Sequence, residues 1–218
     1  LSLSNDGMTA VIGARDEDGV ALNSGAVYIY RLTEGSWVET DKFTPSNVGW
    51  DTGAYANYGS SVCIAGNGET VMVGCPGGGD WYRGGSAYVY SYIDGEWTQA
   101  RLTPNDGSKS DEFGYSVSLS SDGTTGIVGA YNSNINEEYD AGSAYIYSLK
   151  NDLWQETKIV ASDGVSGDEF GTSVAISGDG NTVIAGAPYN DAGGNSAGAA
   201  YIYEVKNNNW IEDVKLFN

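Results

Sequence analysis

Five residues between positions 50 and 83 have side chains suited to ligand binding: Trp50, Tyr55, Trp81, Tyr82 and Arg83. Trp50 and Trp81 are the only tryptophans that do not recur at a fixed spacing along the chain. Aromatic rings beside an arginine can stack on a sugar ring or anchor a protein partner. We therefore expect these five residues to bind a protein or glycan ligand. The alternative is that the rings only cover one end of a structural unit.

Carboxylates are the other abundant reactive groups. The chain has 29 acidic and 10 basic residues, a net charge of −19, and no histidine. Without histidine, the chain cannot form a Ser-His-Asp or Cys-His arrangement, and zinc loses its commonest nitrogen ligand. A carboxylate pair can hydrolyse glycosides, but no pair stands out among so many acidic residues. We therefore predict that the protein is not an enzyme and has no cofactor, with a carboxylate-based glycan enzyme as an alternative.

Several acidic groups are candidate metal ligands. They are residues 16–18, residues 137–140, Asp191, and the pairs Asp106/Asp111 and Asp163/Asp168. Asp16 and Asp18, followed by Gly19, resemble the start of a calcium loop, but the later ligands are missing. The two pairs recur at one spacing, which Asx turns to nearby backbone amides explain. We predict no metal site.

An internal repeat organises the chain. The segment 168–188 recurs at 111–130, at 58–76 and, without its beginning, at 1–14. A tryptophan closes each copy at positions 37, 97, 154 and 210, which are 60, 57 and 56 residues apart. Four copies of one unit of about 57 residues fill the chain, so this repeat determines the fold.

Each unit has the pattern of four short strands. In the fourth copy they are expected at 172–177, 182–187, 199–204 and 210–216. Asp-Gly or Asn-Gly lies between the first two strands of every copy and predicts a two-residue primed hairpin, while a short polar turn precedes the tryptophan strand. No helical periodicity of useful length is present. The fold class is therefore all-β, a β-propeller of four-stranded antiparallel blades at about 1–45, 46–103, 104–161 and 162–218, within one domain.

Several motifs in register resemble a known repeat family. Phe113-Gly114, Phe170-Gly171, the variant Tyr58-Gly59 and Gly186-Ala187-Pro188 resemble FG-GAP repeats, from which integrin-α-type propellers are built. Kelch repeats share the Tyr-x6-Trp spacing, but this chain lacks their consistent Gly-Gly pair and has a longer period. Integrin-like repeats often carry a calcium loop between the first two strands. These tight turns cannot supply six to eight oxygen ligands.

The resemblance also bears on the size of the ring. Propellers of this family usually close with seven blades, so the four repeats are expected to be part of a larger ring and of a longer chain. A closed four-bladed ring and an eight-bladed ring of two chains remain alternatives.

Composition excludes some classes of binding partner but does not decide the cellular compartment. The strong negative charge disfavours nucleic acid and anionic membranes as partners, and no apolar run is long enough for a membrane helix. With the hairpin centred at Asn67-Gly68, Cys63 lies opposite Met72 and Cys75 opposite Ser60. The two cysteines are then not cross-strand partners, and we predict buried free thiols.

The connectivity predicts which loops share a face. In a four-stranded meander, the loops between strands two and three lie on the same side as the segments that join successive blades. These loops differ in every copy (15–24, 76–84, 131–141 and 188–197), and this variable face is the expected binding face. We predict a non-enzymatic extracellular or cell-surface module for adhesion, ligand binding or scaffolding, with self-association as a further option. The alternative is an accessory propeller of a larger secreted hydrolase that acts on glycans or lipids.

Overall fold

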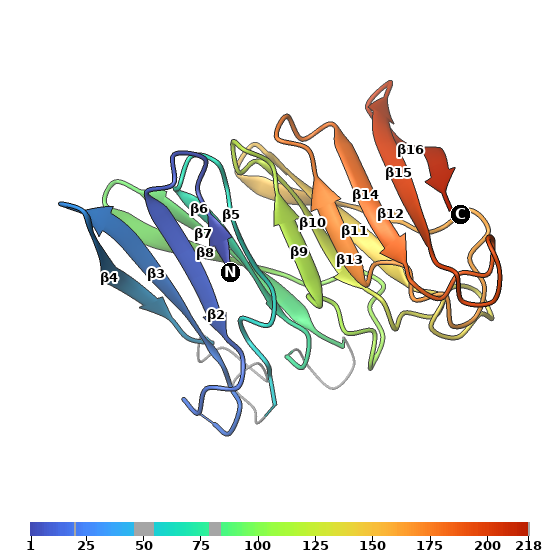
Figure 1. Ribbon diagram of the computed structural model, residues 1–218, viewed down its shortest axis with the longest axis horizontal. Helices are drawn as coiled ribbons and strands as arrows, with labels where there is room; N and C mark the ends of the chain where they lie inside the picture. The colour runs from blue at the N-terminus through green and yellow to red at the C-terminus, as the bar shows by residue number, and fades with distance from the viewer. Residues whose placement is uncertain (20, 46–54, 79–83, 218) are drawn as a thin grey trace.

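A computed structural model describes residues 1–19, 21–45, 55–78 and 84–217. All its regular elements are β-strands, which form four separate antiparallel sheets of four strands (Figure 1). Each sheet pairs its strands in chain order, as a meander does. This confirms the predicted fold class. The described residues contain no helix that could cross a membrane.

Each sheet is one blade of the propeller. Blade 1 consists of β1 (Ser2–Leu3), β2 (Thr9–Ala14), β3 (Ala26–Thr33) and β4 (Ser36–Phe43). Blade 2 consists of β5 (Val62–Ile64), β6 (Thr70–Cys75), β7 (Ser86–Ile93) and β8 (Glu96–Leu102). Blade 3 consists of β9 (Ser116–Leu119), β10 (Thr125–Ala130), β11 (Ser143–Lys150) and β12 (Leu153–Ile159). Blade 4 consists of β13 (Ser173–Ile176), β14 (Thr182–Ala187), β15 (Ala199–Lys206) and β16 (Asn209–Leu216).

The primed two-residue turns join the third and fourth strands of each blade. Both residues of every such turn have a positive φ, as a type I′ turn requires. The pairs are Glu34 and Gly35, Asp94 and Gly95, Asn151 and Asp152, and Asn207 and Asn208. Asparagine, aspartate and glycine tolerate this conformation best, which explains the polar composition of these turns.

The prediction of two-residue primed hairpins between the first two strands is wrong. In blade 4 the Ser177 amide donates to the Thr182 carbonyl, so the loop has four residues, and within it only Gly180 has a positive φ, of 72°. The Asp179 carboxylate accepts hydrogen bonds from the Ser177 hydroxyl and from the Asn181 amide, the latter at 3.1 Å. These side-chain bonds stabilise a wider loop than the Asp-Gly signal alone predicts.

An aromatic–glycine pair joins each blade to the one before it. The aromatic residues are Tyr58, Phe113 and Phe170, and none of them is exposed. A Cβ atom added to Gly13, Gly74 or Gly129 in the second strand would lie 1.9, 1.9 and 2.0 Å from the carbonyl oxygen of the paired glycine in the next blade. Backbone thus packs directly on backbone, as the sequence predicts for these glycines.

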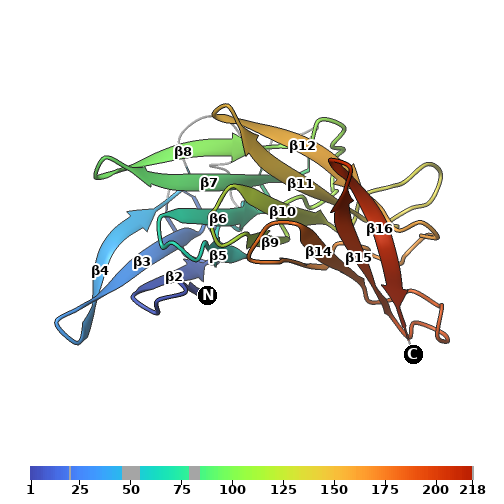
Figure 2. The same ribbon diagram turned by 90° about the horizontal axis from the view of Figure 1, so that it is seen from above.

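The blades fan out in an open arc. Figure 2 shows the first and fourth sheets at opposite ends of the arc, with β4, β8, β12 and β16 along its outer side. The first strands of neighbouring blades contact one another on the inner side. The alternative of a closed four-bladed ring is therefore not observed. Cys63 pairs in register with Met72, and both cysteines are free, as predicted. Cys75 is buried, as predicted, whereas Cys63 is only half-buried.

Candidate functional site

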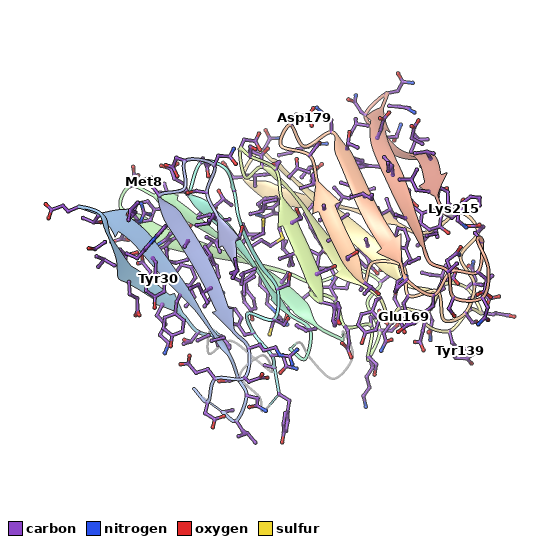
Figure 3. The ribbon with its side chains drawn as sticks, in the orientation of Figure 1. Met8, Tyr30, Tyr139, Glu169, Asp179 and Lys215 are labelled. Atoms are coloured by element: carbon purple, nitrogen blue, oxygen red, sulfur yellow. The ribbon has the colours of Figure 1, made fainter. Side chains whose placement is uncertain are left out.

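The variable face forms where one blade is joined to the next. The amides of Tyr58, Phe113 and Phe170 donate to the carbonyls of Ser24, Gly84 and Ala141, which end the loops of the preceding blades. The segment leading into each blade therefore lies beside the loop between the second and third strands of the blade before it. Figure 3 shows Glu169 and Tyr139 on this side of the molecule and Asp179 and Met8 on the opposite side.

Only one of the five predicted ligand-binding residues belongs to the described part. Tyr55 lies on the variable face with its side chain 58% exposed and with a φ of 66°. Its amide donates to the Leu22 carbonyl at 2.9 Å, which fixes it beside the loop of blade 1. Trp50, Trp81, Tyr82 and Arg83 lie outside the described residues. Their role stays a prediction.

Two glutamates occupy equivalent places at the start of blades 3 and 4. Glu112 and Glu169 each precede the buried phenylalanine, with φ values of 54° and 56°, and Asn57 has the same conformation in blade 2. The amides of Tyr115 and Thr172 donate to the Glu112 and Glu169 carbonyls at 3.1 and 3.2 Å and close these tight turns. Left-handed backbone is uncommon for glutamate, and such residues gather at functional sites.

The glutamates belong to an acid–tyrosine cluster of Glu112, Tyr115, Tyr131, Asp140 and Glu169. Burial raises the pKa of Glu169, and the nearby Asp140 and Glu112 carboxylates raise it further. Burial also raises the pKa of the Tyr131 hydroxyl, and the negative charge of Glu112 adds to this rise. The Tyr115 and Tyr131 rings lie 4.5 Å apart between centroids, tilted by 60°. The cluster thus combines aromatic surface with several hydrogen-bond acceptors.

The exposed tyrosines of the described part all lie on the variable face. They are Tyr55, Tyr115, Tyr139 and Tyr189, with exposed fractions of 58%, 41%, 71% and 51%. The backbone of Tyr139 is fixed, because its amide donates to the Ser166 hydroxyl and its carbonyl accepts from the Gly167 amide. An exposed ring on a fixed backbone loses little conformational freedom when a ligand binds.

The aspartate pairs fix the segments that lead into blades 3 and 4. As predicted, Asp111 and Asp168 accept hydrogen bonds from nearby backbone amides, those of Ser108 and Val165. These amides precede each aspartate by three residues, which is not the geometry of an Asx turn.

The first aspartate of each pair has different partners. Asp163 accepts from the Tyr201 hydroxyl at 2.7 Å and from Lys215 Nζ at 2.6 Å, and Asp106 repeats this with Tyr145 and Lys158. These bonds tie the segment that leads into blade 3 or blade 4 to the two outer strands of the same blade. Within the described ranges, no group of three or more cysteine, aspartate and glutamate side chains is placed to hold a metal ion.

Sequence reasoning missed the acid–tyrosine cluster because it concentrated on the tryptophans. One signal was available: the Asp-Glu-Phe-Gly motif occurs twice and places a glutamate beside the buried phenylalanine. The tyrosines that complete the cluster do not recur at a fixed position, so the repeat pattern gave no reason to group them.

The four meander sheets define the chain as a β-propeller. Residues 97–147 and 154–203 match the family model of the FG-GAP repeat. The chain is thus a β-propeller protein with FG-GAP repeats, as the sequence predicts. Each matched segment runs from the outermost strand of one blade (β8 or β12) into the third strand of the next (β11 or β15).

Comparison with other proteins shows that the chain is similar in fold to a solved structure. No curated protein matches the chain. Among solved structures, the chain resembles the periplasmic gluconolactonase PpgL of Pseudomonas aeruginosa, with a TM-score of 0.58 and 12% sequence identity. The match covers 99% of this chain and 56% of that one, so the chain spans little more than half the length of that protein.

This comparison corrects the prediction that the protein is not an enzyme. The similar propeller from Pseudomonas aeruginosa is a gluconolactonase, so a propeller of this shape can carry out catalysis. The absence of histidine excludes only mechanisms that need an imidazole within this chain, and the lack of a distinctive carboxylate pair in the sequence does not exclude catalysis by carboxylates. Carboxylates and tyrosine hydroxyls, which the variable face has, are also used in catalysis.

Proposed function

We propose that this chain is a secreted or cell-surface propeller module that binds glycans through its variable face. The observation that carries the proposal is the position of the exposed tyrosines: all four of those described lie on this face. A tyrosine ring offers an apolar surface to the C–H face of a sugar, and its hydroxyl can bond at the rim. The neighbouring carboxylates accept hydrogen bonds from sugar hydroxyls.

Charge narrows the class of glycan. A net charge of −19 repels anionic polysaccharides, so the ligand is a neutral or amino sugar polymer. Such binding would serve adhesion to a cell surface or a matrix. The FG-GAP repeats and the periplasmic location of the similar structure support a location outside the cytoplasm.

A second candidate is an accessory propeller within a larger secreted hydrolase. This candidate is supported by the gluconolactonase of similar fold, because the match covers only 56% of that longer protein. In that role the variable face would hold substrate for catalytic groups. The two candidates share one binding face and differ in what the whole protein does.

The test is a screen of neutral, amino and anionic glycans, followed by calorimetric titration of the best binder. Tyr139→Ala should weaken binding about 10-fold, or ~1.4 kcal/mol, because it removes an exposed aromatic contact. The control is Met8→Ala, since Met8 is also exposed but lies on the opposite face. Failure to bind any glycan, or equal losses in the two variants, would refute the proposal. Release of sugars from the bound glycan would favour a catalytic role.

A further inference from the structure

A hollow of about 450 Å³ opens in the loop between the second and third strands of blade 3. It is lined by Asn134, Asn136, Glu137 and Tyr139, so one short stretch of chain supplies two amides, a carboxylate and an aromatic ring. Its volume lies within the range of about 300–1,000 Å³ that is typical of small-ligand sites. The hollow belongs to the variable face and is formed by a loop whose sequence does not recur in the other blades.

The backbone around the hollow is fixed. Ile135 and Glu138 form an antiparallel bridge, in which their amides donate to each other's carbonyls at 3.0 and 2.9 Å. The Glu138 carboxylate accepts hydrogen bonds from the amide and the hydroxyl of Ser166, which tie the loop to the segment that leads into blade 4. Asn136 lies at the tip with a φ of 57°. Groups held in this way lose little conformational freedom when a ligand binds.

The lining side chains offer both donors and acceptors. Asn134 Oδ1 accepts a hydrogen bond from the Asp140 amide at 2.9 Å, so this side chain presents its two N–H donors. The Asn136 side chain has a carbonyl acceptor as well as donors, and the Glu137 carboxylate is acceptor-only. The Tyr139 ring, 71% exposed, adds an apolar surface beside these polar groups.

The Glu137 carboxylate is an uncompensated charge. It has no hydrogen bond or ion pair with any described residue. Neither its own loop nor the segment 160–171 beside that loop contains a lysine or an arginine. The acidic residues in the corresponding loops of blades 1 and 4 are paired: Asp16 with Arg15, Glu17 with Lys42, Asp18 with the Asn23 amide, and Asp191 with the Ser196 amide.

We infer that this hollow is a subsite for a sugar that carries a free, protonated amine, and that Glu137 determines this specificity. The inference rests on the proposed binding of glycans by the variable face and narrows their class from neutral or amino sugars to amino sugars. The ammonium group donates to the Glu137 carboxylate and to the side-chain carbonyl of Asn136. Asn134 donates to a neighbouring sugar hydroxyl, and the Tyr139 ring stacks on the C–H face of the sugar.

Charge explains why the amine must be free. An ammonium group beside Glu137 gains a Coulomb attraction that an N-acetyl or hydroxyl group at the same carbon does not gain. Because Glu137 is exposed, water and salt weaken this attraction, so its effect on affinity is moderate.

The test compares two ligands by calorimetric titration at pH 6: a hexamer of β-1,4-linked glucosamine and the same hexamer with every amine acetylated. The glucosamine hexamer should bind about 5-fold more tightly at low ionic strength. Glu137→Gln should remove this preference and leave binding of the acetylated hexamer unchanged. The preference of the parent chain should shrink in 1 M salt.

The matched control is Glu69→Gln. Glu69 is also an exposed glutamate without a partner among the described residues, but it lies in a hairpin on the opposite face. Both variants remove one negative charge, so only the position of the charge distinguishes them. Hexalysine serves as a cationic ligand without a sugar ring, and Tyr139→Ala should weaken the glucosamine hexamer but not hexalysine.

The outcomes separate this inference from the proposed function. Equal binding of the two hexamers, or equal losses in Glu137→Gln and Glu69→Gln, would overturn the inference. If Tyr139→Ala still weakened the acetylated hexamer in that case, glycan binding by the variable face would stand. A loss of hexalysine binding in Tyr139→Ala as large as the loss for the glucosamine hexamer would mean that the hollow takes a cationic peptide. Failure of every glycan to bind would refute both proposals.

Discussion

The interface between blades gives a matched pair of substitutions, Gly129→Ala and Gly186→Ala. Both glycines occupy the same place in the second strand, and neither has a positive φ, so alanine brings no backbone strain to either position. They differ only in what lies above them. A Cβ atom at either position would meet a serine hydroxyl of the first strand, that of Ser116 at 2.3 Å from Gly129 or that of Ser173 at 2.7 Å from Gly186. Only the Cβ atom on Gly129 would also lie 2.0 Å from a backbone carbonyl oxygen of the next blade, that of Gly171.

The expected loss of stability follows from this geometry. Relief of the contact at Gly129 requires blades 3 and 4 to move apart by more than about 1 Å, and overpacking of this kind costs typically about 1–3 kcal/mol. The movement would also strain the 2.8 Å hydrogen bond from the Ser116 hydroxyl to the Gly171 carbonyl. Because the obstacle is backbone, we expect about 3 kcal/mol for Gly129→Ala. Gly186→Ala should stay within about 1 kcal/mol of the parent chain.

The assay is urea and thermal unfolding followed by circular dichroism. A loss of 3 kcal/mol corresponds to a fall in Tm of roughly 6–12 °C for a chain of this size. The Gly186→Ala variant should melt close to the parent. Equal losses in the two variants would refute the account of the interface, because they would show that the Gly171 carbonyl does not distinguish the two glycines.

Three further predictions concern single side chains. Asp122→Ala should lower the free energy of unfolding by about 0.5–1 kcal/mol at pH 7, because hydrogen bonds within its turn outweigh burial and lower the pKa of this carboxyl. The loss should shrink as the pH falls below 4, and a loss that does not depend on pH would contradict this origin. Glu169→Gln should stabilise the fold at pH 7, because burial and then repulsion from the nearby carboxylates disfavour the charged form and raise the pKa of this carboxyl. The gain should disappear as the pH falls to 4 and the carboxyl takes up a proton. Destabilisation at pH 7 would contradict the assignment. Both thiols should titrate only slowly in the native chain, since Cys75 is buried and burial raises the pKa of Cys63, and a native disulfide would contradict the structure.

The architecture could be predicted from the sequence because it repeats. The strands Thr182–Ala187 and Asn209–Leu216 lie where the pattern of alternating residues and turns places them. The aromatic–glycine pairs and the second-strand glycines indicated the blade interfaces, since only a close approach of backbones requires glycine at those places.

Loop geometry was harder to predict, because one dipeptide is compatible with several turns. The Asp179-Gly180 pair predicts a primed hairpin, yet the Ser177 hydroxyl and the Asn181 amide donate hydrogen bonds to the Asp179 carboxylate and stabilise a wider loop. The primed turns occur at Asn151-Asp152 and its equivalents, where the flanking strands pair directly across two residues. Side-chain bonds across a loop decide such cases, and a short motif does not show them.

The candidate site could be predicted only in outline. The connectivity of a meander fixes which loops share a face, so the variable face followed from the repeat alone. Which residues meet on it did not follow, because Glu112 and Glu169 come from different blades and Tyr131 from a loop that is not repeated. Their grouping depends on the packing of one blade against the next.

The most direct test of glycan binding by the variable face is hydrogen–deuterium exchange with and without the best glycan from the screen. Slower exchange should appear in residues 131–141 and 188–197 and in the segment around Glu169. The hairpins on the opposite face, at residues 121–124 and 178–181, should not change. Protection of those hairpins, or no change in the loops of the variable face while glycan is bound, would contradict the account.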